Sequence, residues 1–223
     1  MPLALAPGIS FCECDQRRIF LDLARDRYFC LGEPADQAFG ALLRGAAPSD
    51  EQVRRLDTLV ASGILAHSPF GDLPRPCRAR APGTSLLDAE QQPPANAWQS
   101  LAAAAAVARA RFALRRLGLA RMAAGARRLK EDRPRGERRP PPEQLAAIAA
   151  AFRSASQITG ARDLCLPRSF AILRHCLAHE IGAEMVIGVK LRPFQAHAWV
   201  VCDGALISDP LATITPFTPI LTL

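Results

Sequence analysis

Hydrophobic and polar positions alternate along the first third of the chain in a way that predicts short strands followed by helices. The segments "ISFCEC" (9–14), "RIFLDL" (18–23) and "RYFCL" (27–31) are runs of β-favouring residues separated by polar turns. The next stretches, "PADQAFGALLRG" and "PSDEQVRRLDTLVASGIL", repeat apolar residues at helical spacing. We therefore expect three small antiparallel strands and then two helices.

The second of these helices carries clear start and stop signals. Ser49 can cap its N-terminus, Gln52 follows three positions later, and Gly63 suits the position just past its end. Four apolar residues fall on one face of the helix, and we interpret them as core residues. They are Val53, Leu56, Leu59 and Val60.

The middle of the chain lacks this order and divides it into regions. Six prolines between residues 66 and 94 interrupt any periodic pattern, whereas residues from about 97 to 130 are rich in Ala, Leu and Arg at helical spacing. The segment "EDRPRGERRPPP" ends that pattern, and "EQLAAIAAAFRSAS" begins another helix. We predict an N-terminal domain (1–66), a linker (67–96), a helical spacer (97–142) and a C-terminal domain (143–223).

The C-terminal domain is expected to place a helix against an antiparallel sheet, which makes the whole chain α+β. The helix "CLPRSFAILRHCLAHEIG" starts beside Cys165, since Asp163 can cap it and Pro167 fits only a first turn, and Gly182 is expected to end it. Two strand-like runs, "EMVIGVKL" and "QAHAWVVC", follow, and "CDG" then turns the chain into "ALISDP".

Composition narrows the location and the partners. The opening "MPLALAPG" lacks the features of a secretory signal and no long uncharged apolar run occurs, so we expect seven free cysteines in a bacterial cytoplasm and no membrane span. Basic residues concentrate between 109 and 139, with 12 Lys or Arg against 3 acids. We interpret this segment as a solvated helix face, although it could contact an acidic peptide, a partner protein or nucleic acid.

Candidate chemistry centres on Cys165, because a helix N-terminus lowers the pKa of a thiol. His197 shares a strand face with Trp199. If the next turn is the three-residue loop Cys202–Gly204, Asp209 on the returning strand faces His197, and Cys165, His197 and Asp209 form a thiol triad. A two-residue loop of Asp203 and Gly204 would instead turn Asp209 to the other face of the sheet.

Other reactive side chains have simpler interpretations. Cys12, Cys14 and Cys30 lack a fourth ligand for structural zinc, so we expect them to pack in a small core. His175 and His179 have a two-ligand spacing without an HExxH motif, and we expect both to face solvent. We predict neither a metal nor a cofactor. Cys176 and Cys202 are expected to pack. Arg168 could support the thiolate or serve only at the surface, and Trp199 could shield the triad, line a substrate groove or be a plain core aromatic.

The N-terminal domain resembles the RiPP recognition element, a winged-helix-like domain that binds the leader of a ribosomal precursor peptide. The resemblance rests on "FLDLARDRYFCLGEPADQAFGALL" followed by "LVASGIL". In that family the leader adds a strand beside the third strand and lies against the last helix. The resemblance implies that the leader-binding residues are Tyr28, Phe29, Cys30, Leu31, Arg54, Arg55 and Thr58.

The C-terminal domain resembles the transglutaminase-like cysteine protease domain of lasso-peptide biosynthesis B proteins, the leader peptidases. The segment "CLPRSFAILRHCLAHEIGAEMVIGVK" with "AHAWV" and "DP" carries this similarity. It implies a transglutaminase/papain-like fold in which Cys165 is the nucleophile, His197 the general base and acid, and Asp209 the orienting carboxylate. It also implies two partners, the leader region of a lasso precursor peptide and a separate asparagine-synthetase-like cyclase that closes the macrolactam.

Three other functions remain open at this point. The chain could be a scaffold that binds the leader without cutting it, or its nucleophile could pass an acyl group to an amine, as transglutaminases do. A winged-helix-like domain beside a basic segment could instead bind nucleic acid. We do not expect nucleic-acid binding, because the strands lack an obvious recognition helix with base-reading side chains.

Overall fold

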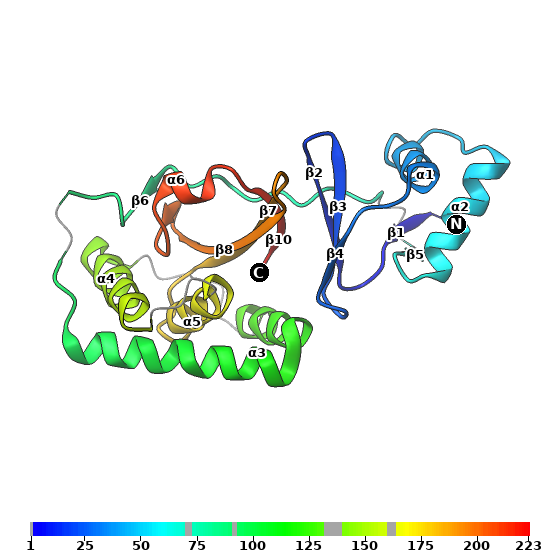
Figure 1. The fold of residues 1–223 in the computed structure, drawn as a ribbon. Coiled ribbons are helices and arrows are strands. Elements are labelled where there is room, and N and C mark those ends of the chain that lie inside the picture. The colour runs from blue at the N-terminus through cyan, green and yellow to red at the C-terminus, as the bar shows by residue number, and fades with distance from the viewer. Residues whose placement is uncertain (1, 70–72, 91–92, 132–139, 160–163) are drawn as a thin grey trace. The chain divides into compact units, whose positions relative to one another are not determined.

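A computed structural model describes residues 2–69, 73–90, 93–131, 140–159 and 164–223 (Figure 1). It divides the chain into two compact units, Met1–Arg78 and Ala79–Leu223. Each unit combines helices with a largely antiparallel sheet, so the predicted α+β class is confirmed. None of the described helices combines the length and the apolar character that a bilayer crossing requires.

The first unit contains the three strands and two helices expected from the sequence. Its elements are β1 (Leu3–Leu5), β2 (Ile9–Cys14), β3 (Arg17–Asp22), β4 (Arg27–Phe29), α1 (Glu33–Leu43), α2 (Asp50–Ala61) and β5 (Leu65–His67). The antiparallel sheet has the order β2-β3-β4. Asp15 and Gln16 connect β2 to β3 with positive φ angles, as a tight hairpin turn requires. The pairing of β1 with β5 was not predicted.

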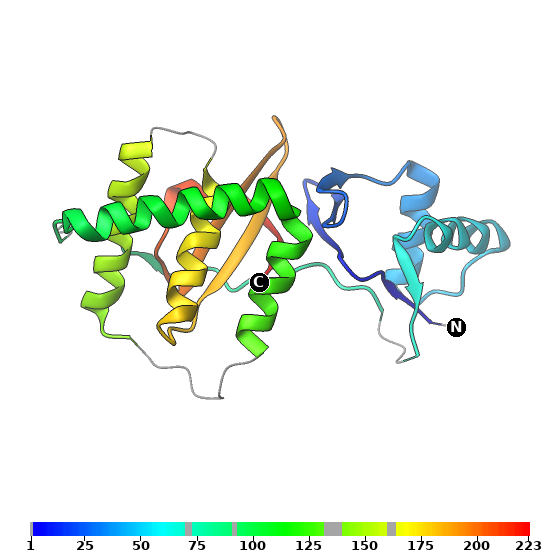
Figure 2. The same cartoon turned by 90° about the horizontal axis from the view of Figure 1, so that it is seen from below.

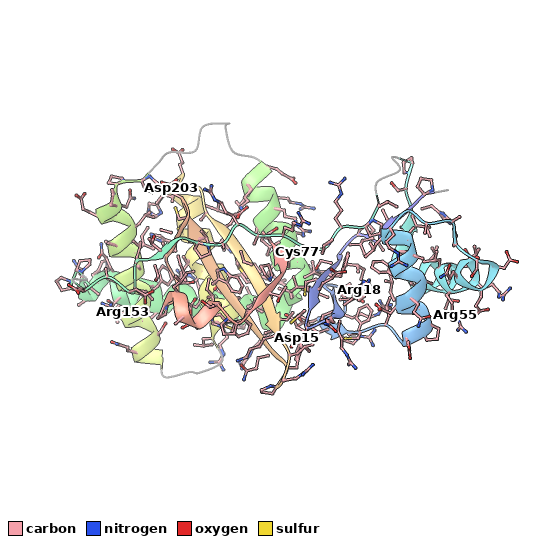
Figure 3. The ribbon with its side chains drawn as sticks, turned by 90° about the horizontal axis from the view of Figure 1, so that it is seen from above. Asp15, Arg18, Arg55, Cys77, Arg153 and Asp203 are labelled. Atoms are coloured by element: carbon pink, nitrogen blue, oxygen red, sulfur yellow. The ribbon has the colours of Figure 1, made fainter. Side chains whose placement is uncertain are left out.

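Aromatic side chains hold the sheet of the first unit to its helices. Phe11, Phe20 and Phe39 are fully buried, and their ring centroids lie 5.2–5.4 Å apart. Arg18 of β3 donates a hydrogen bond to the carboxylate of Asp36 in α1 at 2.8 Å and so adds a polar link (Figure 3).

Helix α2 begins and ends as the sequence predicts. The Ser49 side chain accepts a hydrogen bond from the backbone of Gln52, whose side chain accepts one from the Ser49 backbone, and Gly63 follows the helix with a φ of 74°. Leu56 and Leu59 are buried and Val60 packs against the same core. Val53 is 41% exposed, so its assignment to the core was wrong. Val53 lies in the first turn of α2, ahead of Leu56, which is the first buried residue of the helix.

The second unit places helices against a five-stranded sheet. Its elements are β6 (Thr84–Ser85), α3 (Ala97–Glu131), α4 (Pro142–Thr159), α5 (Cys165–Ala178), β7 (Glu184–Lys190), β8 (Gln195–Cys202), β9 (Ala205–Leu206), α6 (Leu211–Ile214) and β10 (Thr218–Thr222). The strand order is β10-β7-β8-β9-β6, and only the outermost pair, β9 with β6, is parallel.

Helices α3, α4 and α5 form a layer on one face of this sheet (Figures 1 and 2). Helix α5 packs directly on β7 and β8, and α3 packs against α4 and α5. Gly118 interrupts α3 with a φ of 77° and a ψ of 167°, and the helix bends there. The spacer predicted at 97–142 thus contains a helix that covers the one carrying Cys165.

Part of the region predicted as a linker also lies along the second unit. Strand β6 pairs with β9, and the backbone N–H groups of Gly83 and Leu86 donate to the carbonyls of Gly204 and Leu206. The side-chain hydroxyl of Ser85 is buried. These contacts bring the chain from residue 83 to 86 beside the strand that leads to Asp209.

The turn between β8 and β9 has two residues, not the three that a direct pairing of His197 with Asp209 requires. Asp203, which Figure 3 labels, and Gly204 both have positive φ angles, 49° and 78°, and Cys202 pairs with Ala205. This geometry is that of the tight turns that match the twist of antiparallel strands. The three-residue loop was therefore the wrong alternative.

Candidate active site

Cys165 is the first residue of α5, at the helix N-terminus where the sequence places it. Pro167 lies in the first turn, as predicted. The predicted capping residue, Asp163, lies outside the described residues, and the residue at the cap position is Leu164, which makes no side-chain capping bond. The helix ends at Ala178 rather than at Gly182, since Glu180 already has a φ of 60°.

His197 projects from β8 toward Cys165 and Asp209. Its side chain is 16% exposed, and its Nε2 atom lies 3.1 Å from Oδ1 of Asp209. The thiol of Cys165 lies close enough that each group shifts the pKa of the other, through a side-chain hydrogen bond and through charge. The structure thus brings together all three residues proposed for the triad.

Asp209 reaches His197 because the β8–β9 ladder stops before it. Regular pairing ends at Leu206, and the backbone N–H of Val200 donates to the side-chain oxygen of Ser208 at 2.9 Å instead of to a strand carbonyl. The Ser208 hydroxyl donates in turn to Oδ2 of Asp209 at 2.6 Å, and the Ser85 hydroxyl donates to the Asp209 backbone carbonyl at 2.7 Å. Ser208 therefore fixes the carboxylate of Asp209, and Ser85 fixes its backbone.

Arg168 contacts the carboxylate rather than the thiol. Its guanidinium donates to Oδ1 of Asp209 at 2.5 Å, and the two side chains are only 19% and 6% exposed. Burial raises the pKa of Asp209, but the hydrogen bond from His197 and the positive charge of Arg168 outweigh this effect and lower it. The carboxylate therefore stays ionised at neutral pH.

The three side chains favour a thiolate–imidazolium pair. Burial raises the pKa of the Cys165 thiol, but hydrogen bonds with the His197 side chain and with the backbone of Ala198 outweigh it and lower that pKa. Burial lowers the pKa of His197, but its hydrogen bonds with Asp209 and Cys165 raise it to about 9. A buried thiolate beside a protonated imidazole is the arrangement that activates cysteine as a nucleophile.

A further hydroxyl, which the sequence analysis did not identify, links the helix of Cys165 to the strand of His197. Ser169 of α5 is fully buried and donates a hydrogen bond to the backbone carbonyl of Ala198 at 2.8 Å. Ala198 follows His197 directly, and Ser169 lies one turn after Cys165. No pattern in the sequence identifies Ser169, Ser208 or Ser85, because their roles depend on contacts between distant segments.

Trp199 lies beside the triad in the core of the sheet. Its side chain is 3% exposed, and its ring is nearly parallel to that of His197, with 6.3 Å between the centroids. It fills the space above Gly188, the strand partner of His197. A cavity of about 370 Å³ is lined by Trp199, Phe217 and Ile214 together with residues 79–82. Apolar side chains therefore surround one side of the reactive centre.

The remaining cysteines and histidines lie apart from this arrangement. Cys12 and Cys14 are buried as expected, but Cys30, just after β4, is exposed, so its expected packing in the core was wrong. Burial raises the pKa of Cys12 to about 12, which keeps it a thiol. Cys176 and Cys202 are buried, as expected of packing residues. His179 is exposed as predicted, but His175 is half-buried against Phe152, so its expected exposure was wrong. The helix α4 that carries Phe152 covers this side of α5.

The residues proposed for leader binding all lie in the first unit. Tyr28 and Phe29 are half-buried in the edge strand β4, while Cys30 and Leu31 follow it. Three further residues, Arg54, Arg55 and Thr58, are exposed on α2. The two arginines lie one turn after Glu51 and bind its carboxylate at 2.6 and 2.8 Å.

Comparisons with known proteins identify relatives of this chain. A family model described as the transglutaminase-like superfamily matches residues 104–222, the region that holds α5 and the strands β7 to β10. The chain is also similar to the microcin J25-processing protein McjB of Escherichia coli, with 42% identity over 45 residues. That match covers 20% of this chain and 22% of the relative, so it spans about a fifth of each protein. No solved structure matches the chain.

Proposed function

The chain belongs to the transglutaminase-like superfamily, and on that premise we propose that it is a cysteine peptidase that removes the leader from a lasso precursor peptide. The observation that carries this proposal is the contact of His197 with both Cys165 and Asp209. The similarity to a microcin J25-processing protein supports a peptide precursor as the substrate. The reaction needs neither a metal nor a cofactor.

The proposed reaction is acyl transfer in two stages. The Cys165 thiolate attacks the carbonyl carbon at the end of the leader, and backbone N–H groups at the start of α5 stabilise the oxyanion. Protonated His197 gives its proton to the departing amine, which becomes the N-terminus of the core peptide. Neutral His197 then takes a proton from water, the resulting hydroxide displaces the thiolate from the thioester, and the leader leaves as a carboxylic acid.

Asp209 and Arg168 act through the histidine. Asp209 fixes the ring orientation and stabilises the imidazolium, and Arg168 together with Ser208 fixes Asp209. Trp199 and the apolar cavity beside it keep water away from the ion pair. A peptide side chain next to the cleaved bond would enter that cavity.

The first unit is the proposed leader-binding element. Strand β4 forms one edge of its sheet, whereas at the opposite edge Phe11 of β2 accepts a backbone hydrogen bond from Cys77 at 2.7 Å. An extended leader would add to β4 beside Tyr28–Leu31 and lie against Arg54, Arg55 and Thr58. Binding at this edge raises the effective concentration of the cleavage site at Cys165.

The product defines the next partner. Cleavage frees the amine at the core N-terminus, which a macrolactam requires, and an asparagine-synthetase-like cyclase would consume it. We place both steps in the bacterial cytoplasm, with no role for a membrane or for nucleic acid.

The decisive experiment incubates the precursor peptide with the wild-type chain, with Cys165→Ala, and with Cys176→Ala as a matched control in the same helix. Mass spectrometry should show free leader and core with the wild type and Cys176→Ala, and intact precursor with Cys165→Ala. Leader binding, measured by fluorescence anisotropy, should be equal for all three proteins. If none of them cuts the precursor with the cyclase present, the chain is a leader-binding scaffold. A leader that gains the mass of an added amine would identify a transglutaminase.

A further inference from the structure

Helix α3 exposes a row of apolar side chains on the side that faces away from α5. Trp98 is 76% exposed, Leu101 56% and Phe112 61%, and the exposed Ala105 and Ala108 lie between them. We call these five residues the outer row. Figure 2 looks onto α3 from this side. Eight large hydrophobic side chains are exposed among the described residues, and five of them lie on α3, so this surface is concentrated on one helix.

The outer row does not take part in the fold of the second unit. The opposite side of α3 supplies the buried residues Ala103, Val107 and Ala110, and it is this side that packs on α4 and α5. A helix that is apolar on two opposite sides has more apolar surface than its own domain can bury. Exposed apolar surface of this extent marks an interaction site.

The spacing and shape of the outer row fit another helix. Its members follow one another at intervals of three, four, three and four residues, the pattern of a coiled-coil seam. Large side chains stand at both ends and the two alanines lie in the middle, where a crossing helix can approach closely. A flat bilayer surface would gain little from the low middle of the row that the two alanines create.

Charge identifies the kind of helix. Residues 97–130 contain eight Arg or Lys and no Asp or Glu. Arg109, Arg115 and Arg116 are exposed at the C-terminal part of the outer row, and the Arg116 guanidinium lies 5.1 Å from the centre of the Phe112 ring. A second copy of α3 paired in parallel would bring arginines against arginines. In either direction the outer-row part of that copy, residues 97–116, offers them no carboxylate.

We propose that the outer row of α3 is a docking surface for an acidic amphipathic helix of a partner protein. The partner's apolar residues would pack between Trp98 and Phe112, and its Glu or Asp side chains would pair with Arg109, Arg115 and Arg116. This proposal is independent of the peptidase reaction, because the outer row faces away from α5 and its Cys165.

Trp98 provides a direct signal for the test. The chain has two tryptophans, and Trp199 is already buried, so burial of the outer row shifts the fluorescence of Trp98 to shorter wavelength. The full chain is titrated with a synthetic helix of about three heptads that has Leu at its seam positions and Glu at the flanking positions. A second peptide keeps every Glu but has Gln at the seam. Two further titrations complete the experiment. One uses vesicles of phosphatidylcholine and phosphatidylglycerol, and the other dilutes the protein alone.

We expect a saturable shift with the Leu/Glu peptide alone. The Leu101→Asp/Phe112→Asp variant should weaken this binding by at least about tenfold, whereas Val53→Asp, at another exposed apolar site on α2, should not change it. Trp98→Phe should remove the signal while calorimetry still detects binding.

An equal shift with the Gln peptide would show that charge alone accounts for the binding and would overturn the proposal. A Trp98 shift that occurs with vesicles only would assign the surface to an anionic membrane. A shift that depends only on protein concentration would assign it to a second copy of the chain. No shift under any of these conditions would refute the proposal.

Discussion

Oδ1 of Asp209 lies 3.1 Å from Nε2 of His197, although strand register would point the two side chains to opposite faces of the sheet. The contact forms because Ser208 replaces a backbone partner of Val200 and bends the chain out of the ladder. The link between these two residues therefore depends on an irregular segment, and its chemical importance can be tested directly.

Asp209→Asn should lower kcat/KM for precursor cleavage at neutral pH by about 10²–10⁴-fold. Cleavage needs His197 protonated, and its pKa is raised to about 9, so wild-type activity should fall as the pH rises through that value. Removing the carboxylate charge lowers the pKa of His197, and the alkaline limb should move to lower pH. A pH–rate profile checks this. Asp203→Asn, in the β8–β9 turn, should leave the profile unchanged; an unmoved limb in Asp209→Asn would exclude Asp209 as the orienting group.

Arg168→Met should weaken catalysis through Asp209, by about tenfold, the effect of losing roughly 1.4 kcal/mol of interaction. The Arg168 charge helps to keep the pKa of Asp209 below its usual value. Without it that pKa rises, and the acid limb of the pH–rate profile should move to higher pH. Arg168→Lys should restore part of the shift, and Arg174→Met, an exposed change in the same helix, should have no effect. Equal pH–rate profiles for Arg168→Met and the wild type would show that Arg168 has only a structural role.

Cys165 should react with iodoacetamide faster than an ordinary thiol at slightly acidic pH, because its pKa is lowered. His197→Ala should raise the pH at which half of the maximal rate is reached. Peptide mapping after brief labelling would follow Cys165 and the exposed Cys30 in the same sample, so Cys30 serves as an internal reference. The idea of an activated thiolate fails if the two cysteines show the same pH dependence.

Gly188→Ala should destabilise the chain by about 1–3 kcal/mol. An added Cβ would lie 2.5 Å from Cη2 of Trp199, so the indole must move, and His197 beside it would be displaced as well. Gly125→Ala, where the added Cβ meets no atom within 4 Å, should instead stabilise α3 by about 0.5–1 kcal/mol. Urea denaturation followed by circular dichroism measures both, and cleavage activity should fall only in Gly188→Ala.

The sequence predicted features that depend on local chemistry. The strands 9–14 and 18–23, the Ser49 cap and the position of Cys165 all follow from periodicity, turn residues and capping preferences within a few neighbouring positions. The resemblance of the C-terminal segment then supplied the pairing of Cys165 with His197, which no local pattern contains.

Features that depend on distant contacts were missed or misjudged. The pairing of β1 with β5 joins residues some sixty positions apart, and the Ser85 hydroxyl bonds Asp209 across 124 positions. The loop prediction was wrong for a related reason. It assumed that the strands continue in register to Asp209, whereas the ladder ends at Leu206 and side-chain bonds take over.

The hydrogen bond from Ser169 to the carbonyl of Ala198 has one more consequence. It fixes the spacing of Cys165 and His197 within one packed helix–strand pair, while Asp209 and Ser85 join from other segments of the same unit. All the residues of the proposed reaction centre thus belong to the second unit. Under the proposed function, a different recognition element could be joined to this unit without a change in its chemistry, and new cleavage specificities are best engineered in the recognition element.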